Sequence, residues 1–328
     1  MSYLILGSNS FAGASLVDYL ITREQKVIGV SRSHEPHKLL LVYAKNPNLK
    51  LFNFYPYDLN QHFDELKALI DRKKPKFVID FAGQGMVAES WKNPEQWYQT
   101  NIVSKVKLHT YLRHCDFLEK YVRVSTPEVY GSTPVAVDEK QSFNPSTPYA
   151  VSHAAIDMSL KAFYQQWQFP VVLTRFANFY GPYQQLYRII PRAILYCLLG
   201  KKLQLHGGGL SQRAFIFGED VAESIDCVLQ KGKLGETYHF SSEKPITIKN
   251  LVEKICDRMR VPFDSFAQVS EERPGKDELY FMDTNTAKNE LLWSPKINLD
   301  QGIEKTVDWL SANLNIIKTL PQEYIHKL

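Results

Sequence analysis

Short apolar runs and amphipathic segments alternate along the N-terminal half of the chain, and this alternation constrains the fold more than any other feature. Apolar runs predict strands at residues 3–7, 26–32, 76–83, 120–126 and 170–178. Apolar residues at helical spacing predict helices at 15–23, 63–75, 97–115 and 149–167, and 49–59 is a further apolar segment. Strands that alternate with helices are typical of a parallel sheet covered on both faces. The sequence therefore predicts an α/β protein with a Rossmann-type, doubly wound parallel sheet.

The amino-acid composition changes after Tyr180. The following residues are rich in Gly, Pro and basic side chains, and later segments mix short strands with helices such as 248–260. We therefore expect a first domain at residues 1–178 and a smaller C-terminal lobe formed mainly by 179–328. A segment at about 214–242 is expected to return to the first domain.

Composition and charge narrow the class of protein. With 328 residues, 44% of them hydrophobic, the chain can bury a substantial core. The net charge of +4 is small and scattered, so nucleic-acid binding is not indicated. The four cysteines, which have no C-x-x-C spacing, are interpreted as buried thiols in a reducing compartment rather than metal ligands: Cys115, Cys197, Cys227 and Cys256. No leader peptide and no run of roughly 18 apolar residues is evident, which favours a cytoplasmic protein without a membrane partner.

The turn between the first strand and the first helix, GSNSFAG at residues 7–13, contains two framing glycines. Glycines in such a turn let the backbone approach a pyrophosphate, which the N–H groups of the helix N-terminus bind. Ser10 replaces the middle glycine of the usual pattern, and a plain turn is the alternative. We predict a dinucleotide-binding turn formed by Gly7, Asn9, Ser10, Phe11 and Gly13.

The end of the second strand distinguishes between two cofactors. An acidic residue here would bind the ribose hydroxyls of NAD, but the chain has Ser31 and Arg32. A hydroxyl and a guanidinium suit a 2′-phosphate, so the sequence favours NADP, with NAD as the alternative. A solvated arginine at a strand end is the plain alternative.

Several motifs occur in an order that carries a family resemblance: GSNSFAG, YDL, FAGQGMVAES, TNIVS, STPEVYG, NPSTPYAVSH, RFANFYGP and ERPGKDELYFMD. Together they resemble the extended short-chain dehydrogenases/reductases, and within them the nucleotide-sugar 4,6-dehydratases, over nearly the whole chain. The resemblance implies oxidation of sugar carbon 4, elimination of water across carbons 5 and 6, and return of the hydride to carbon 6. The cofactor is then recycled in place, and the substrate is a nucleoside-diphosphate sugar.

The resemblance assigns roles in the reaction to three residues. Tyr149 matches the tyrosine that takes the proton of the 4-hydroxyl, Thr126 the hydroxyl that contacts the reacting oxygen, and Glu128 the base at carbon 5. Pro127 stands where dTDP-glucose members have an aspartic acid. GDP-mannose members also lack it, so Glu128 could act first as base and then as acid.

His153 stands where the family has a lysine. Four residues after Tyr149, it occupies the same face of the predicted helix. We expect a largely neutral imidazole that bonds the nicotinamide ribose and activates Tyr149 more weakly than an ammonium would. A helix histidine with its ring facing solvent is the alternative.

The resemblance also implies the remaining site residues. Asn101 matches a buried asparagine beside the active site, and Asp58 has an alternative role as a helix N-cap. Further cofactor contacts are expected at Asp58, Leu59, Ala82 and Gly83, besides Tyr149 and His153. Contacts to the sugar nucleotide are expected from Asn178, Arg188, His206, Arg213, Arg273 and Lys276.

Two other functions stay open from the sequence. A 4-epimerase or reductase of the same fold would not require Glu128, and a catalytically silent NADP-binding protein would fit the missing lysine and aspartic acid. Family members commonly form homodimers through a four-helix bundle, for which residues 97–114 and 149–167 offer apolar faces.

Overall fold

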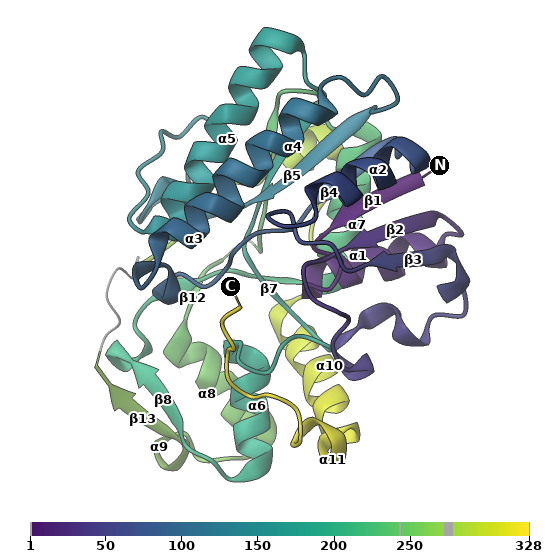
Figure 1. The fold of residues 1–328 in the computed structure, drawn as a ribbon. Helices are drawn as coiled ribbons and strands as arrows, with labels where there is room; N and C mark the ends of the chain where they lie inside the picture. Colours follow the sequence, from purple (N-terminus) through teal and green to yellow (C-terminus); the bar gives the residue numbers. More distant parts are fainter. Residues whose placement is uncertain (1, 243, 272–277, 328) are drawn as a thin grey trace.

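A seven-stranded parallel sheet forms the centre of the computed structural model, which describes residues 2–242, 244–271 and 278–327 (Figure 1). The strand order is β11-β6-β5-β4-β1-β2-β3, and every neighbouring pair is parallel. The strands are β1 (Ser2–Leu6), β2 (Lys26–Val30), β3 (Phe52–Tyr55), β4 (Phe77–Asp80), β5 (Lys120–Ser125), β6 (Val171–Phe176) and β11 (Thr237–Phe240). The order reverses between β1 and β4, which confirms the doubly wound sheet and places a ligand crevice at the carboxyl ends of these strands.

Helices cover both faces of the sheet. On β1, Leu4 and Leu6 belong to one hydrophobic cluster, whereas Tyr3 and Ile5 belong to another. The first cluster is completed by α2 (Phe63–Lys73), α4 (Ser104–Leu112) and α5 (Pro148–Trp167), and the second by α1 (Phe11–Thr22) and α7 (Gly218–Lys231). Burial on both faces explains why the strands read as continuous apolar runs rather than as alternating ones.

The long helix predicted at 97–115 is interrupted. It consists of α3 (Pro94–Tyr98), a π-helical turn (Gln99–Val103) and α4, which ends at Leu112. Such π-turns are frequently found at functional sites. The turn contains Asn101, whose side chain is fully buried.

The cysteine prediction is partly wrong. Cys256 is buried, but Cys115, Cys197 and Cys227 are only partly buried; all four are free. Cys115 follows the end of α4 instead of lying within it, because the helix stops three residues earlier than the pattern suggested.

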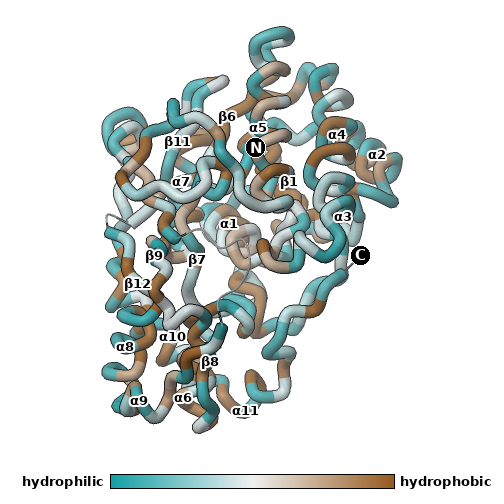
Figure 2. Tube along the Cα trace, turned by 90° about the vertical axis from the view of Figure 1, so that its left-hand side faces the viewer, coloured by the Kyte–Doolittle hydropathy of each residue, from teal (hydrophilic) through white to brown (hydrophobic). Residues whose placement is uncertain are grey.

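The smaller lobe packs around three helices, α6 (Ile189–Leu199), α8 (Ile248–Met259) and α10 (Leu299–Ala312). Both hydrophobic and hydrophilic residues occur along α8 (Figure 2), and the apolar residues at helical spacing form its buried side. Short strand pairs complete the lobe: β8 (Leu203–His206) with β13 (Ala267–Ser270), β9 (Gln212–Arg213) with β12 (Ile246–Thr247), and β7 (Asn178–Tyr180) with β10 (Phe215–Phe217). We propose the predicted boundary at residue 178 because this lobe has its own hydrophobic cluster. Among the described residues, no helix combines the length and apolar character that spanning a membrane requires.

The C-terminal segment returns to the sheet after α11 (Leu314–Ile317). In Figure 1 its end lies between the smaller lobe and the sheet. The ring of His326 stacks on Trp97 of α3, with ring centroids 5.4 Å apart and planes inclined by 9°. Residues 318–327, which we call the C-terminal tail, therefore contact the part of the molecule that contains the crevice.

Candidate active site

The turn between β1 and α1 is built for close approach of backbone to backbone. Gly7 has φ +81°, and a Cβ atom there would lie 2.8 Å from the amide nitrogen of Ala82. A Cβ on Gly13 would lie 2.3 Å from the carbonyl oxygen of Gly7. Only glycine fits these two positions, so the start of α1 can approach the carboxyl ends of the strands.

Ser10 takes the place of the middle glycine without distorting the turn. Its φ of −70° suits any residue, and its hydroxyl accepts a hydrogen bond of 3.0 Å from the amide of Gly13. Ser10 is therefore the N-cap of α1. This cap explains why the helix begins at Phe11, earlier than its apolar spacing alone predicts.

A cavity of about 380 Å³ opens at this turn. Most of the predicted cofactor residues line it: Gly7, Asn9, Ser10, Ser31, Arg32, Asp58, Leu59, Ala82 and Gly83. Phe11 and Gly13 are buried and lie outside the lining, where they support the turn. Helix N-terminus, glycine turn and cavity together fit the diphosphate and adenosine parts of a dinucleotide.

The polar residues at the end of β2 hold one another in place. The hydroxyl of Ser31 accepts a hydrogen bond of 3.0 Å from the amide of Asn9, and Arg32 Nε lies 4.0 Å from a carboxylate oxygen of Asp58. Asp58 also accepts a hydrogen bond of 2.6 Å from the amide of Asn60. It therefore closes a turn, and the alternative role as helix N-cap is wrong, because α2 starts after His62.

The C-terminal tail forms part of the cavity wall. The carbonyl oxygen of Lys327 accepts hydrogen bonds from Arg32 (3.0 Å) and from the side chain of Gln84 (2.9 Å). The ammonium of Lys327 donates to the hydroxyl of Ser33 at 2.9 Å. Sequence reasoning missed this tail, because no residue pattern in it indicates a ligand or a strand.

Three predicted catalytic residues meet at the end of β5. Thr126 caps a short 3₁₀-helix (Pro127–Tyr130), and its hydroxyl donates a hydrogen bond of 3.2 Å to the carboxylate of Glu128. Pro127 occupies the first position of this helix, where its missing N–H costs nothing. Tyr149 is the second residue of α5, and both the side chain of Thr126 and the charge of Glu128 act on the pKa of its phenol.

The groups around Tyr149 shift the pKa of its phenol in opposite directions. Burial and the nearby charge of Glu128 raise the pKa of the Tyr149 phenol above its usual value of 10. The hydrogen bond with Thr126 and the charges of Arg188 and Arg123 lower this pKa. The group is therefore a protonated phenol at neutral pH, and it can act as a base only where cations such as these favour the phenolate.

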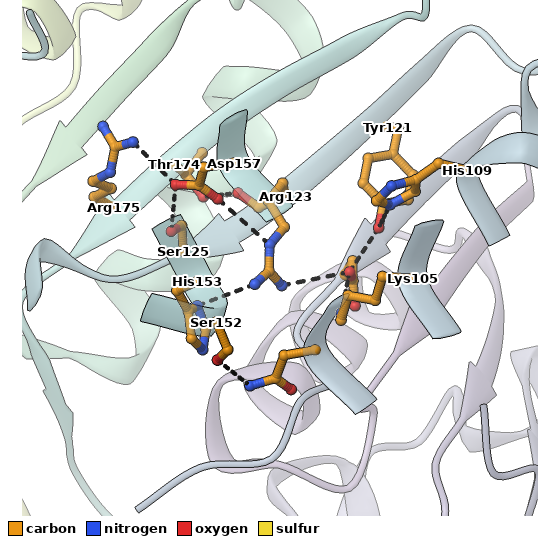
Figure 3. Close-up of polar contacts among 12 residues, drawn as sticks. Lys105, His109, Tyr121, Arg123, Ser125, Ser152, His153, Asp157, Thr174 and Arg175 are labelled. Carbon is orange, nitrogen blue, oxygen red and sulfur yellow. Dashed lines mark hydrogen bonds and ion pairs between the residues drawn. The ribbon is translucent and has the colours of Figure 1, made fainter. Parts of the chain in front are cut away.

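A cluster of buried charges surrounds Arg123 (Figure 3). We call it the charge cluster, and its members are Asp80, Lys105, Arg123, Asp157 and Arg175, all fully buried. Arg123 reaches Asp80 at 3.5 Å and Asp157 at 3.8 Å, and Arg175 donates to Asp157 at 3.0 Å. Lys105 donates to Asp80 and, at 2.6 Å, to the carbonyl oxygen of Ala82. The cluster thereby links the end of β4 to β5, β6, α4 and α5.

The charge cluster shifts the ionisation of its own members. Burial lowers the pKa of the Lys105 ammonium to about 8, although Asp80 opposes this. Burial alone would raise the pKa of Asp80, but the charges of Lys105 and Arg123 hold it below its usual range. The carboxylate of Asp80 is therefore ionised at neutral pH.

His153 contacts the charge cluster through one ring nitrogen. Nη2 of Arg123 lies 3.0 Å from Nδ1 of His153, and the rings of His153 and Tyr149 lie 4.5 Å apart between centroids. Burial first, and then the charges of Arg123 and Lys105, lower the pKa of His153 well below 6.5. The imidazole is therefore neutral, and the alternative of a solvent-facing helix histidine is wrong. The contact to the nicotinamide ribose stays a prediction.

Asn101 joins the cavity wall to α5. Its side-chain oxygen accepts from the amide of Gln84 at 2.7 Å, and its nitrogen donates to the hydroxyl of Ser152 at 3.0 Å. Ser152 precedes His153, and Gln84 lines the cavity. The buried side chain of Asn101 in the π-turn thus ties the cofactor cavity to the helix that carries Tyr149.

Four of the predicted sugar-nucleotide residues are described, and they lie at β7, α6, β8 and β9 of the smaller lobe. Asn178 is exposed on β7, and Arg188 stands at the start of α6, where its charge acts on Tyr149. Nδ1 of His206 lies 3.1 Å from the carbonyl oxygen of Glu271, and Arg213 lies over the ring of Tyr280 at 4.3 Å. Arg273 and Lys276 lie outside the described residues, and the binding roles of all six stay predictions.

The charge cluster was missed by the sequence reasoning, although a signal was present. Residues 120–126 are predicted from the sequence as a strand in which Arg123 interrupts apolar residues, and a buried strand position rarely holds an arginine without partners. Asp157 follows His153 by one helical step of four residues. A charged residue on the face shared with Tyr149 and His153 could have been paired with Arg123.

Three features define an extended short-chain dehydrogenase/reductase: the doubly wound sheet, the glycine turn with the cavity beside it, and the tyrosine at the start of α5. The sequence profile of the GDP-mannose 4,6 dehydratase family matches residues 4–306, so the chain belongs to this family. The dTDP-glucose 4,6-dehydratase of Xanthomonas campestris pv. campestris is 33% identical to this chain. The matched region covers 95% of this chain and 93% of that protein.

Two further similarities concern a plant protein and a solved structure. A trifunctional UDP-glucose 4,6-dehydratase, 3,5-epimerase and reductase of Arabidopsis thaliana is 28% identical over 94% of this chain. The chain spans 47% of the length of that relative. The crystal structure of dTDP-glucose 4,6-dehydratase from Bacillus anthracis in complex with NAD has a TM-score of 0.85 and 30% identity, covering 96% of this chain and 98% of that one.

Proposed function

We propose that this protein is a nucleotide-sugar 4,6-dehydratase. The observation that supports the proposal most directly is that the hydroxyl of Thr126 donates to Glu128 while Thr126 and Glu128 both act on the phenol of Tyr149. A hydroxyl donor, a carboxylate and a phenol in one place are the groups needed to remove two protons from neighbouring positions of a sugar.

The residues of the glycine turn fit a nicotinamide dinucleotide. Because they lack a Cβ atom, Gly7 and Gly13 let the turn pack closely against Ala82 and against itself, which brings the start of α1 to a cavity whose volume is typical of ligand sites. Gly7, Asn9, Ser10 and Ala82 would hold the bound group. A bound nicotinamide supplies one chemical capability here, which is to accept a hydride and later to return it.

Side chains of the protein accept and donate the protons in the proposed reaction. Tyr149 takes the proton of the 4-hydroxyl as carbon 4 becomes a ketone, and Thr126 orients the reacting oxygen. The ketone acidifies carbon 5, where Glu128 takes the proton and passes it to the hydroxyl of carbon 6, which leaves as water. Pro127 has no acidic group, so Glu128 performs both transfers. When the hydride that a bound nicotinamide would supply is returned to carbon 6, carbon 5 takes up a new proton that comes from solvent through Glu128.

We further propose NADP as the preferred cofactor. Arg32 and the ammonium of Lys327 flank the end of β2, where Ser31 and Ser33 provide hydroxyls. Two cations suit a 2′-phosphate, whereas an acidic residue would suit a free hydroxyl. Calorimetric titration with NADP and NAD tests this: Arg32→Ala should weaken NADP binding and leave NAD binding nearly unchanged, and equal losses would contradict it.

The substrate that we propose is a nucleoside-diphosphate sugar, which Arg188 and Arg213 would bind through its diphosphate. We also propose a homodimer through α4 and α5. Val103 of the preceding π-turn, and Val151 and Met158 of α5, expose 55%, 38% and 61% of their surface. Light scattering should show a dimer for the native chain and a monomer for Met158→Asp; a native monomer would contradict this assembly.

Turnover in D₂O tests the proposed reaction. A dehydratase must exchange the hydrogen on carbon 5 with solvent, so the product should lack one water and carry deuterium at carbon 5. Glu128→Gln should abolish both changes, and Glu119→Gln, at the distant exposed start of β5, should abolish neither. A product of unchanged mass with inverted carbon 4, equally formed by Glu128→Gln, would favour the epimerase instead.

A further inference from the structure

The hydrogen bond between Arg123 and His153 determines where the proton of the imidazole lies. A guanidinium carries only donors and stays charged at any pH relevant to proteins. Nδ1 of His153, 3.0 Å from Nη2 of Arg123, must therefore accept. The one proton of the neutral ring is then on Nε2.

Arg123 is itself held from two sides. Asp80 at the end of β4 and Asp157 on α5 contact its guanidinium at 3.5 and 3.8 Å. Lys105 and Arg175 hold these two carboxylates in turn, so Arg123 stands at the centre of the charge cluster (Figure 3). Three buried cations face two carboxylates, which leaves one positive charge of the charge cluster uncompensated.

We propose that Arg123 is a positioning residue that fixes His153 as the neutral Nε2–H tautomer, so that one N–H beside Tyr149 is available to the bound cofactor. In the same arrangement Arg123 supplies the positive charge that a lysine at position 153 would carry. The inference rests on the proposed function only in naming the cofactor as the recipient of that hydrogen bond. It divides the work of one lysine between a donor at His153 and a charge at Arg123.

Replacing His153 with the lysine of the family pattern should therefore not improve the site. A lysine at position 153 would place its ammonium against the guanidinium of Arg123, with the ammonium of Lys105 nearby. Like charges at this distance within a buried site repel strongly. His153→Lys should therefore impair the site while Arg123 is present, and Arg123→Met should relieve that defect.

Histidine-selective ¹⁵N NMR on the native chain tests the tautomer without any substrate. The ring of Tyr149 on α5 and the charges of Arg123 on β5 and Lys105 on α4 act on His153, while Asp80 on β4 and Asp157 on α5 contact Arg123. The signal assigned by its absence in His153→Gln should be that of a neutral Nε2–H ring at about pH 7, and it should stay so down to about pH 5.5. An Nδ1–H ring or an imidazolium would overturn the proposal. Because nothing turns over in this experiment, failure of the dehydratase assay would not affect its outcome.

A double-mutant cycle tests the coupling through a second readout, the affinity for NADPH measured by its fluorescence. Arg123→Met and His153→Lys should each weaken binding by about tenfold, and the double variant should bind more tightly than either. Arg123→Lys keeps a charge and a donor and should stay within about threefold of the native chain. Losses that multiply in the double variant would overturn the proposal, as would native affinity in His153→Lys.

Lys120→Met provides the matched structural control. This buried lysine lies on the same strand, but its ammonium donates to the carbonyl oxygens of Val228, Leu229 and Gly232, each at 2.9 Å. Its removal should lower stability and leave the His153 signal unchanged. If Arg123→Met is recovered folded and gives the same result as this control, Arg123 is merely structural. If Arg123→Met does not fold, the native NMR signal and His153→Lys alone decide.

Discussion

The glycine turn and the reaction centre each depart from their family pattern, and the two departures have different structural consequences. At the turn, Ser10 replaces a glycine and simply caps α1, because φ at that position is −70°. At the reaction centre, His153 replaces a lysine, and its ring is held by Arg123 within the charge cluster. A site made of backbone tolerates a new side chain, whereas a site made of side chains requires neighbours that take over the missing charge.

Loss of the Tyr149 phenol should have the largest effect of any single change. Tyr149→Phe removes the group that accepts the 4-hydroxyl proton and should lower turnover by about 10³-fold, within the range for general base catalysis. Cofactor affinity, measured by fluorescence titration, should change little. Tyr164→Phe, on the same helix and away from the centre, should keep native turnover. Equal turnover in both variants would place the chemistry elsewhere.

Buried histidines should make the free energy of unfolding of the protein depend on pH. Burial lowers the pKa of His109 and of His239 to about 3, and that of His153 well below its usual value. Below about pH 6.5 the unfolded chain binds protons that the folded chain does not, so the free energy of unfolding falls as pH falls. Each histidine contributes at most about 1.4 kcal/mol per pH unit.

Urea unfolding between about pH 7 and pH 5 measures this slope. His109→Gln should reduce the slope, whereas His114→Gln, on the surface, should leave it unchanged. A free energy of unfolding that stays constant across this range would contradict the neutral, buried state of these rings.

Gly7→Ala should damage the turn where Ser10 does not. The new Cβ would lie 2.8 Å from the backbone of Ala82 with φ at +81°, which costs about 2 kcal/mol of stability. Cofactor affinity should fall as well, because the turn must open. Gly85→Ala is the matched control, since nothing lies within 4 Å of its Cβ position. Unfolding of both variants at equal denaturant concentration would show that the turn is not constrained as described.

The smallest effect is expected at Ser10 itself. Ser10→Ala removes the cap and should cost about 1 kcal/mol, whereas Ser10→Gly, which restores the usual pattern, should cost only a few tenths. Thermal unfolding distinguishes the two. A larger loss for glycine than for alanine would mean that the hydroxyl of Ser10 is not acting as a helix cap.

The sequence predicted the parts that follow from periodicity and local pattern. Alternating strands and helices gave the parallel sheet, and the motifs brought Thr126, Glu128 and Tyr149 to one strand end. Within the charge cluster, the pair of Arg123 and Asp157 left a signal in the sequence. The other three members could not be predicted in this way, because Asp80, Lys105 and Arg175 come from separate elements that meet only in the folded sheet, where Asp80 lies beside Arg123. The C-terminal tail was also beyond reach, since Lys327 contacts Arg32 through its backbone, which carries no sequence signal.

Mass spectrometry of the purified protein with dTDP-glucose, UDP-glucose, UDP-N-acetylglucosamine and GDP-mannose tests the central claim most directly. The account predicts that one of these sugars loses one water in the presence of native enzyme and that Glu128→Gln prevents the loss. Unchanged mass with all four sugars, from a protein that still binds its dinucleotide, would contradict the claim that Thr126, Glu128 and Tyr149 form a dehydratase centre.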